Sequence, residues 1–416
     1  KQLTSFYTMI QKPLLTLFIF LTSQLAFTQG FQVNFQGQKQ QGMGGAGTAL
    51  PIDGASLFFN PGSSSFLKEN SANLAMTPTF ARSLFVDANT NQSARTNSPM
   101  GTPFSAYAVY RKSAESKLFF GLAAYTPFGS TVQWEDNWMG RFALTRLELK
   151  SIFIQPTISY KITDKIGLGA GFVYCTGNVN LQKDLPVMDA SGTYGHAELA
   201  GKANGFGVNA GIFVQATEKI GVGLTYRSQV NMSVSNGQAT FTVPSSLVAN
   251  FPDGSFSSSL PLPQVITLGL AYKPSEKLSF ALDINYVGWK AYDTLAFDYE
   301  TNTTSLVDTK SVRSYENIFA FRGGANYEFT ENFAARLGIA YGISPVQDGY
   351  VTPETPDANR INYTAGLSYK VGKHFSFDAS IFFTHVKRTD INIETNLSGT
   401  YTTNVVAPGL AIIYGF

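Results

Sequence analysis

Three histidines and one cysteine are the side chains best suited to catalysis or metal binding, and their positions argue against both. His196, His374 and His385 are far apart and share no ligand spacing, so they support neither a metal site nor a Ser-His esterase. Cys175 is the only cysteine, which excludes an internal disulfide. We therefore expect no catalytic residue, no metal and no cofactor, and we expect that the protein is not an enzyme.

A glycine-rich run, Gly42-Met-Gly-Gly-Ala-Gly47, matches the dinucleotide-binding fingerprint by letter. That fingerprint needs a buried strand before it and a βαβ unit around it, whereas a glutamine-rich stretch precedes this run. The formal net charge is only +2, from 30 basic and 28 acidic residues, and no polybasic run is present. We therefore expect neither a nucleotide nor a nucleic acid as a partner.

The same glycines are better explained as part of a compact plug, here called the hatch (residues 29–69). Glycine permits close backbone approach and positive φ, and Lys39 and Asp53 are the only charged residues between 31 and 67. Apolar residues alternate at its free end, where they could line a ligand site and withdraw from it, although a partly disordered mature terminus would give the same pattern. The hatch residues that we expect at a ligand pocket are Phe31, Val33, Phe35, Phe58 and Phe59.

Composition and the first 28 residues indicate an exported membrane protein. Only 14% of the residues are charged, against roughly 25% in soluble globular proteins, while 14% are aromatic. An apolar run over 13–25 follows Lys12 and precedes Ala26-Phe27-Thr28, which is the pattern of a signal peptide. The run is shorter than the ~20 apolar residues of a membrane-spanning helix. Residues 1–28 are therefore expected to be a signal peptide.

From about residue 70 onward the dominant hydrophobic period is two, as in β-strands with two unlike faces. Between 278 and 286 the even positions are apolar, from Leu278 and Phe280 to Ile284, whereas Asp283 and Asn285 fall on the other face. A soluble sandwich would show the same alternation. The connections favour a membrane barrel instead, because very short ones alternate with long polar ones, as periplasmic turns and extracellular loops do.

Counting these segments predicts an all-β fold, a transmembrane antiparallel β-barrel of about 14 strands, uncertain by two, over residues 70–416. The long polar loops are expected at 86–102, 129–143, 183–196, 237–261, 300–306, 346–357 and 395–399. The chain ends with apolar side chains at alternate positions up to Phe416, which resembles the signal that barrel-assembly machinery recognises in its clients.

Several motifs, in their order along the chain, resemble those of the FadL-type family of outer-membrane transporters for long-chain fatty acids and hydrocarbons. They are the start Phe31-Gln-Val-Asn, the Gly42–Gly47 run, Asn60-Pro61-Gly62, Tyr125-Thr-Pro127-Phe-Gly129, Tyr286-Val-Gly-Trp289 and Arg336-Leu-Gly-Ile-Ala-Tyr341. The resemblance covers 31–416, with Gly62 standing where family members usually carry alanine. It implies a monomeric barrel in the bacterial outer membrane, in contact with its lipid, that admits a hydrophobic ligand and releases it sideways through a gap in strand three.

The sequence offers a local reason for such a gap. Pro127 has no N–H for the strand ladder, and Gly129 weakens strand pairing. We therefore expect a lateral gate formed by Pro127 and Gly129, with Asn60 and Pro61 of the hatch beside them. The alternative is that Pro127 merely ends the strand at a loop.

A carboxylate ligand would need a basic partner inside the barrel. Arg322 and Arg336 fall on the polar phase of their strands, and Lys183 lies where a strand enters a long loop, so these three are the candidate head-group contacts. Each could equally be a structural charge of the lumen that pairs with an acid. Glu316 lies near one place where a base would be expected, which weakens the case for a strictly anionic ligand.

The competing hypothesis is a non-transporting outer-membrane barrel, an adhesin or structural protein that acts through its long loops. The hatch argues against it, because such a barrel has no need of an apolar plug. The sequence does not identify the cargo, and it leaves open whether a ligand would leave sideways or through the hatch.

Overall fold

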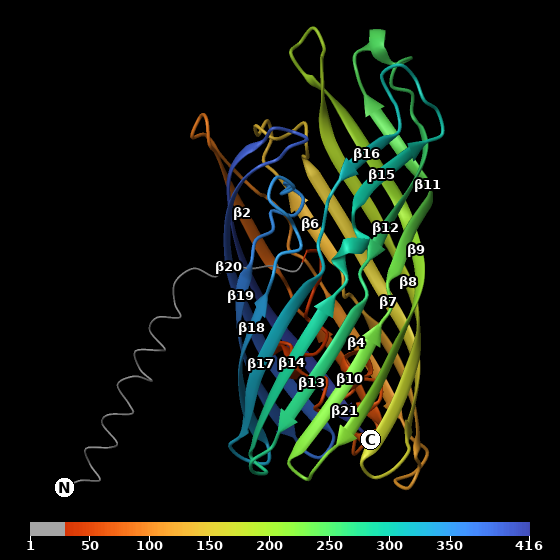
Figure 1. Cartoon of the computed structure of the whole chain (residues 1–416), viewed down its shortest axis with the longest axis vertical. Coiled ribbons are helices and arrows are strands. Elements are labelled where there is room, and N and C mark those ends of the chain that lie inside the picture. The colour runs from red at the N-terminus through yellow and green to blue at the C-terminus, as the bar shows by residue number, and fades with distance from the viewer. Residues whose placement is uncertain (1–29) are drawn as a thin grey trace, which may run out of the picture.

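A computed structural model describes residues 30–416, and the expected signal peptide lies outside that range. The described chain forms one closed, antiparallel sheet of twenty-one strand segments around a buried N-terminal stretch (Figure 1). The segments are β1 (Ser71–Met76), β2 (Phe80–Asp87), β3 (Ser93–Arg95), β4 (Phe104–Tyr110), β5 (Leu118–Tyr125), β6 (Gly129–Gln133), β7 (Arg146–Lys161), β8 (Ile166–Met188), β9 (Tyr194–Gln215), β10 (Ile220–Arg227), β11 (Val230–Thr242), β12 (Gly254–Leu262), β13 (Val265–Tyr272), β14 (Leu278–Val287), β15 (Thr294–Tyr299), β16 (Thr309–Val312), β17 (Ile318–Glu328), β18 (Phe333–Gly342), β19 (Arg360–Val371), β20 (Phe375–Ile391) and β21 (Ser398–Gly415).

These segments make fourteen crossings of the wall, as the sequence predicted. Seven crossings are each divided into two consecutive segments, namely β1 and β2, β3 and β4, β5 and β6, β10 and β11, β12 and β13, β14 and β15, and β16 and β17. The first crossing pairs with the last, from Ser71 opposite Gly415 to Asp87 opposite Gly399, and this closes the ring. The all-β barrel is thereby confirmed.

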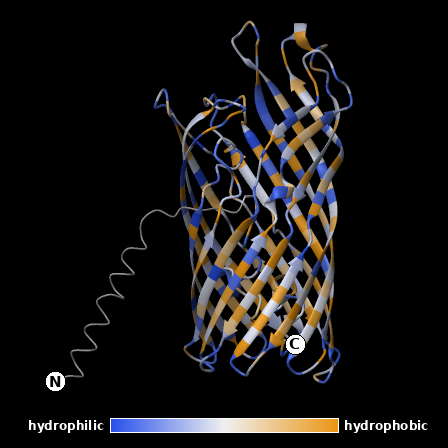
Figure 2. Ribbon diagram, in the orientation of Figure 1, coloured by the Kyte–Doolittle hydropathy of each residue, from blue (hydrophilic) through white to orange (hydrophobic). Residues whose placement is uncertain are grey.

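The two faces of each strand differ as the alternation predicted, with the apolar face turned outward. On β14, Phe280 and Leu282 are 43% and 47% exposed, whereas Asp283 between Leu282 and Ile284 is 1% exposed and faces the interior. Hydrophobic positions alternate with polar ones along the wall in Figure 2. A soluble sandwich is excluded, because its apolar faces would be turned inward.

One end of the barrel carries short turns and the other carries long loops, and we call them the turn end and the loop end (Figure 1). The wall reaches further toward the loop end than the sequence suggested. Strand occupies parts of four segments expected to be loops. β3 lies within 86–102 and β6 within 129–143, while β8 continues to Met188 and β11 to Thr242, inside 183–196 and 237–261. Already before residue 183 on β8 the outward side chains are polar, such as Asn178 and Asn180, so the hydropathy resembles that of a loop.

The hatch fills the half of the barrel nearer the turn end. It contains α2 (Gln38–Gln41), α3 (Ser56–Phe59) and the 3-10 turn η1 (Ser63–Phe66), and the later 3-10 turns are η2 (Ser245–Leu247) and η3 (Trp289–Ala291). Nearly every hatch residue from 35 to 65 is buried. No helix in residues 30–416 is long and apolar enough to cross a membrane.

Glycines let the hatch lie directly on the wall. A Cβ at Gly338 of β18 would be 2.1 Å from the backbone nitrogen of Gly44, and a Cβ at Gly169 of β8 would be 2.3 Å from the carbonyl carbon of Pro61. Gly44 itself has a φ of +73°, which favours glycine. The glycine-rich run therefore serves close packing inside the barrel.

Candidate functional site

The third crossing of the wall, made of β5 and β6 and here called strand three, is interrupted at Pro127, as the sequence suggested. β5 ends at Tyr125 opposite Phe153, and β6 begins at Gly129 opposite Lys150, so three residues of strand three face only two of β7. The other edge of strand three is more open. Its ladder with strand two stops at Ser105 opposite Tyr125 and resumes only at Thr96 opposite Trp134.

The N-terminal segment (residues 30–36) bonds to strand three at this break. Val33 N donates to the Pro127 carbonyl at 2.8 Å, and Gly129 N donates to the Phe31 carbonyl at 3.1 Å, with Gln32 opposite Phe128. The segment therefore forms a short antiparallel pairing with strand three where strand two does not.

Further contacts hold both ends of this segment. Gln36 Nε2 donates to the Thr126 carbonyl at 3.1 Å, and the Tyr107 hydroxyl donates to the Gln36 carbonyl at 2.5 Å. At the other end Gly30 N donates to Asp357 Oδ2 at 3.2 Å. Asp357 lies in the loop between β18 and β19, where burial raises the pKa of its carboxyl to about 6.

An apolar cavity of about 60 Å³ lies in the lumen toward the loop end, with the Phe31 ring as part of its wall. The ring also packs edge-on against Tyr292, at 5.8 Å between centroids, and against Trp289 at 6.3 Å. Space for a few water molecules is too little for a long ligand, so binding requires side chains to move. The lining is otherwise Leu147, Leu149, Val179, Leu181, Ala203, Met232, Val234, Ser258, Leu260, Tyr292, Leu295, Phe297 and Glu354.

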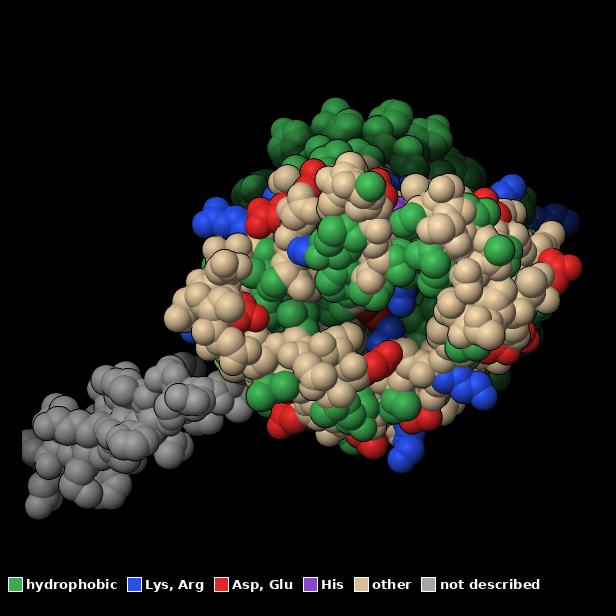
Figure 3. Space-filling view, turned by 90° about the horizontal axis from the view of Figure 1, so that it is seen from above, with side chains coloured by type: hydrophobic (Ala, Val, Ile, Leu, Met, Phe, Trp, Pro, Cys, Tyr) green, Lys and Arg blue, Asp and Glu red, His purple; other side chains and the backbone are tan. Residues whose placement is uncertain are grey.

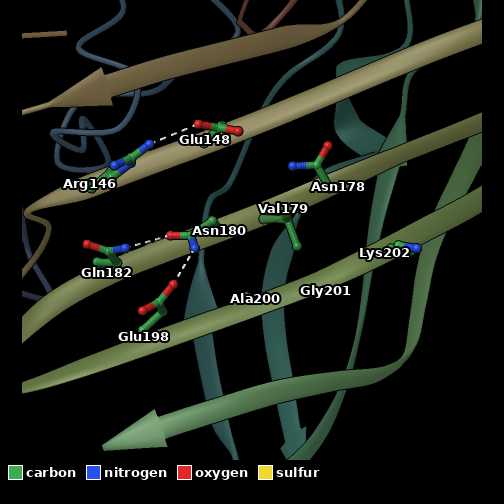
Figure 4. A pocket seen from close by; sticks show the side chains of 10 residues that line it. All are labelled: Arg146, Glu148, Asn178, Val179, Asn180, Gln182, Glu198, Ala200, Gly201 and Lys202. Carbon is green, nitrogen blue, oxygen red and sulfur yellow. Dashed lines mark hydrogen bonds and ion pairs between the residues drawn. The ribbon is translucent and has the colours of Figure 1, made fainter. Parts of the chain in front are cut away.

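Figure 3 shows the loop end from above, with hydrophobic side chains gathered in a hollow between the loops. A second hollow, of about 470 Å³, lies on β7, β8 and β9 and is polar (Figure 4). Several of its side chains pair with one another: Arg146 Nη2 lies 3.0 Å from Glu148 Oε2, and Asn180 Nδ2 donates to Glu198 Oε1 at 2.5 Å. We assign no ligand to it.

The expected hatch residues do not form one pocket. Phe31 lines the cavity, whereas Phe35 packs edge-on against Phe382 at 5.2 Å, with Val33 in the same small cluster. Phe58 and Phe59 lie in α3, where the Phe58 ring contacts Phe59 and Tyr125 at 5.0 Å each and the guanidinium of Arg227 lies 4.0 Å above it. Of the five, only Phe31 touches the cavity.

Asn60 and Pro61 lie elsewhere than the sequence suggested. Asn60 Nδ2 donates to the carbonyls of Thr48 and Ile212, and the Pro61 carbonyl accepts from Ser159 Oγ at 2.7 Å. Ser159 is opposite Phe119, near the turn end of strand three, whereas the break begins after Tyr125. The expectation that these two residues lie beside Pro127 and Gly129 is therefore wrong; they fasten the hatch to β7 and β9.

The candidate head-group bases do not line the cavity either. Arg322 donates to Asn34 Oδ1 at 2.8 Å and to the Gly45 carbonyl at 3.5 Å, so it holds the hatch. Arg336 donates to Ser368 Oγ at 2.6 Å in the wall. Lys183 is half-buried on β8.

The sequence reasoning missed Glu354 and Arg313, the ion pair at the cavity. Arg313 Nη2 lies 2.6 Å from Glu354 Oε1, and both residues are only 7% exposed. They come from two irregular connections, where no periodicity marks the inward side chains. Among residues 30–416, no group of three or more His, Cys, Asp or Glu side chains is placed to hold a metal.

Fold and site together define a plugged outer-membrane barrel, with an apolar cavity beside a break in its wall. Comparison with known families agrees, since the model described as "Outer membrane protein transport protein (OMPP1/FadL/TodX)" matches residues 19–416. The chain belongs to this family, and its place in the bacterial outer membrane is confirmed.

Individual relatives are distant but match over most of their length. A long-chain fatty acid transport protein of Escherichia coli O6:H1 is 23% identical, with 98% of each chain covered. Outer membrane protein P1 of Haemophilus influenzae is 24% identical over 72% of this chain and 71% of its own length.

Solved structures share the fold. A Pseudomonas aeruginosa FadL homologue superposes with a TM-score of 0.80 at 19% identity, covering 93% of this chain and 100% of its own. The P. putida toluene transporter TodX gives 0.73 at 17% identity, covering 94% and 99%.

Proposed function

We propose that the protein is a passive channel that takes up hydrophobic compounds, with long-chain fatty acids as the expected cargo, and releases them sideways into the membrane at the break in strand three. One observation carries the proposal. Phe31 lines the apolar cavity with its ring, and its carbonyl accepts a hydrogen bond from Gly129 at the break. A ligand that displaces this ring therefore also strains the pairing that covers the break.

The driving force for binding needs no energy source. Burying a methylene group gains about 0.8 kcal/mol, so a long acyl chain is drawn from water into an apolar lumen. The small free volume of the cavity means that the ligand and the Phe31 ring compete for the same space. Release into the bilayer then exchanges one apolar environment for another at little cost.

A second candidate cargo is a neutral hydrocarbon. The cavity lining contains no basic side chain, and its one charged residue is an acid, Glu354. One structural neighbour, TodX, is named a toluene transporter. The non-transporting alternative, an adhesin or structural barrel, has no use for an internal apolar cavity beside a covered break.

Restoring the strand should test the proposed route. Replacing Pro127 and Gly129 together with Val adds a main-chain donor and β-propensity at the break. We expect uptake of labelled oleate by cells that lack other uptake routes to fall, while oleate binding to the purified variant persists.

The matched control is Pro156→Val, since Pro156 is an exposed wall residue of β7, opposite Leu122 and away from the break. Uptake by the double variant at the wild-type rate, with equal surface expression and strand three closed in its crystal structure, would contradict lateral release. It would favour passage through the hatch.

A further inference from the structure

Glu354 is among the residues that line the cavity, and an acid at this position bears on the charge that a ligand can carry. Glu354 is the single ionisable residue of the lining apart from Tyr292, and the lining around it is otherwise almost wholly apolar. The inference concerns the same cavity as the proposed function and rests on it.

Glu354 is held firmly in position. Its neighbours in the loop between β18 and β19 are fastened on both sides, because Trp134 Nε1 donates to the Pro353 carbonyl at 3.2 Å and the hydroxyls of Tyr315 and Thr355 bond at 3.1 Å. Thr352 also pairs with Thr355 across the turn. The carboxylate therefore cannot swing away from the cavity without disturbing the loop.

Each of the three guanidinium nitrogens of Arg313, the base paired with Glu354, already has an acceptor. Arg313 directs Nη2 to Glu354 at 2.6 Å, Nη1 to Ser311 Oγ at 2.9 Å and Nε to the Tyr292 hydroxyl at 3.4 Å. Arg313 is not part of the cavity lining. An anionic head group would thus meet the acid of this ion pair before it could reach the base.

We propose that the cavity selects amphiphiles in a neutral, hydrogen-bond-donating form, with the ligand hydroxyl donating to the Glu354 carboxylate. Long-chain alcohols meet this requirement, and so does a fatty acid in its protonated form. An ionised carboxylate would place two negative charges together in a dry site, which is strongly unfavourable. A plain hydrocarbon fits the apolar lining but gains nothing from Glu354.

The test compares three ligands of one chain length with the delipidated protein: oleyl alcohol, oleate and 1-octadecene, at a pH where oleate is fully ionised. We expect wild-type protein to bind the alcohol at least about tenfold more tightly than oleate, as a charge-assisted hydrogen bond allows. Glu354→Gln should reduce this ratio to within about threefold, because the amide carries no charge and offers its own donor.

Glu394→Gln is the matched control. Glu394 Oε2 accepts from Ser311 Oγ, so it lies close to Arg313 and carries the same charge, yet it does not line the cavity. The control should keep the wild-type preference. A change of equal size in both variants would mean that general electrostatics, and not the contact at Glu354, sets the preference.

A second measurement needs no variant and covers the case in which Glu354→Gln does not fold. In wild-type protein the affinity for oleate should rise as the pH falls through the titration of the ligand, while the affinity for oleyl alcohol stays level. Equal affinity for alcohol and oleate at high pH would overturn the inference and leave the channel function intact. Failure of all three ligands to bind would overturn the proposed function, and the inference with it.

Discussion

The hatch meets the barrel in two different ways at its two ends. Its body (residues 38–67) lies backbone to backbone on the wall, and the Asp283 carboxylate accepts three hydrogen bonds from it, from Gly47 N, Thr48 N and Thr48 Oγ1. The N-terminal segment has two main-chain bonds to strand three and one to Asp357, and side-chain bonds join its Gln36 to Thr126 and Tyr107 and its Asn34 to Arg322. In the function proposed above, the body stays in place and seals the lumen, while the segment leaves strand three and uncovers the break.

Removing the Asp283 carboxylate should have the largest effect, because it acts on the fixed body. Asp283→Ala leaves three buried donors without an acceptor, at about 1 to 3 kcal/mol each. We expect the free energy of unfolding to fall by about 4 kcal/mol and single-channel conductance to rise as the body loosens. Asp298→Ala is the control, since Asp298 is an exposed residue of the same crossing. Unchanged conductance in planar bilayers would contradict the anchoring role.

The free energy of unfolding should depend on pH through Asp357, the residue that accepts a hydrogen bond from Gly30 of the segment. Burial raises its folded pKa from 3.8 to about 6, so the folded protein binds this proton more tightly than the unfolded chain. The contribution to stability is therefore fully present below about pH 4 and is lost as the pH rises through about 6. At about 1.4 kcal/mol for each pKa unit, the loss is up to about 3 kcal/mol.

Asp357→Asn should abolish this dependence and still accept the hydrogen bond from Gly30. The measurement is the unfolding free energy of both proteins between about pH 4 and about pH 7. Parallel curves for the two proteins would show that Asp357 does not titrate in this way.

Alanine substitutions at two adjacent glycines of β17 should distinguish the packing of the hatch body against the wall from a general effect of alanine on the strand. A Cβ at Gly324 would be 2.5 Å from Met43 Cα, whereas at the adjacent Gly323 the nearest atoms are 3.7 Å away. Gly324→Ala should cost about 2 kcal/mol through overpacking, and Gly323→Ala should cost little. Equal melting temperatures for the two variants would mean that the body yields at this contact.

Much of the barrel could be predicted because its determinants are local. Alternation on one strand, such as Leu282 against Asp283, fixes which face meets the membrane. Pro127 marks the break in strand three through its missing N–H alone. The strands near the loop end were predicted to be loops, because their outward side chains are polar and the sequence no longer alternates between an apolar outer face and a polar inner face.

The contacts of the hatch could not be predicted, because no period relates a compact irregular segment to the strand that it touches. Asn60 and Pro61 were expected at the break and lie against β7 and β9 instead. Glu354 gave no signal, since a single acid in a long loop is most often solvated. The strands that a glycine-rich plug contacts depend on the packing of the entire lumen, so they cannot be inferred from any one stretch of sequence.

The central claim is that the N-terminal segment must leave strand three for a ligand to pass. Gln32 and Phe128 face each other as a non-hydrogen-bonded antiparallel pair. The Cα atoms of such pairs are typically about 4.5 Å apart, which suits a disulfide. Cysteines at both positions, in a Cys175→Ala background, should therefore lock the segment over the break, while each single-cysteine variant controls for the oxidant. Uptake of labelled oleate should fall to background when the pair is oxidised and recover on reduction, with ligand binding retained throughout. Uptake at the same rate in the oxidised and reduced states would contradict the account.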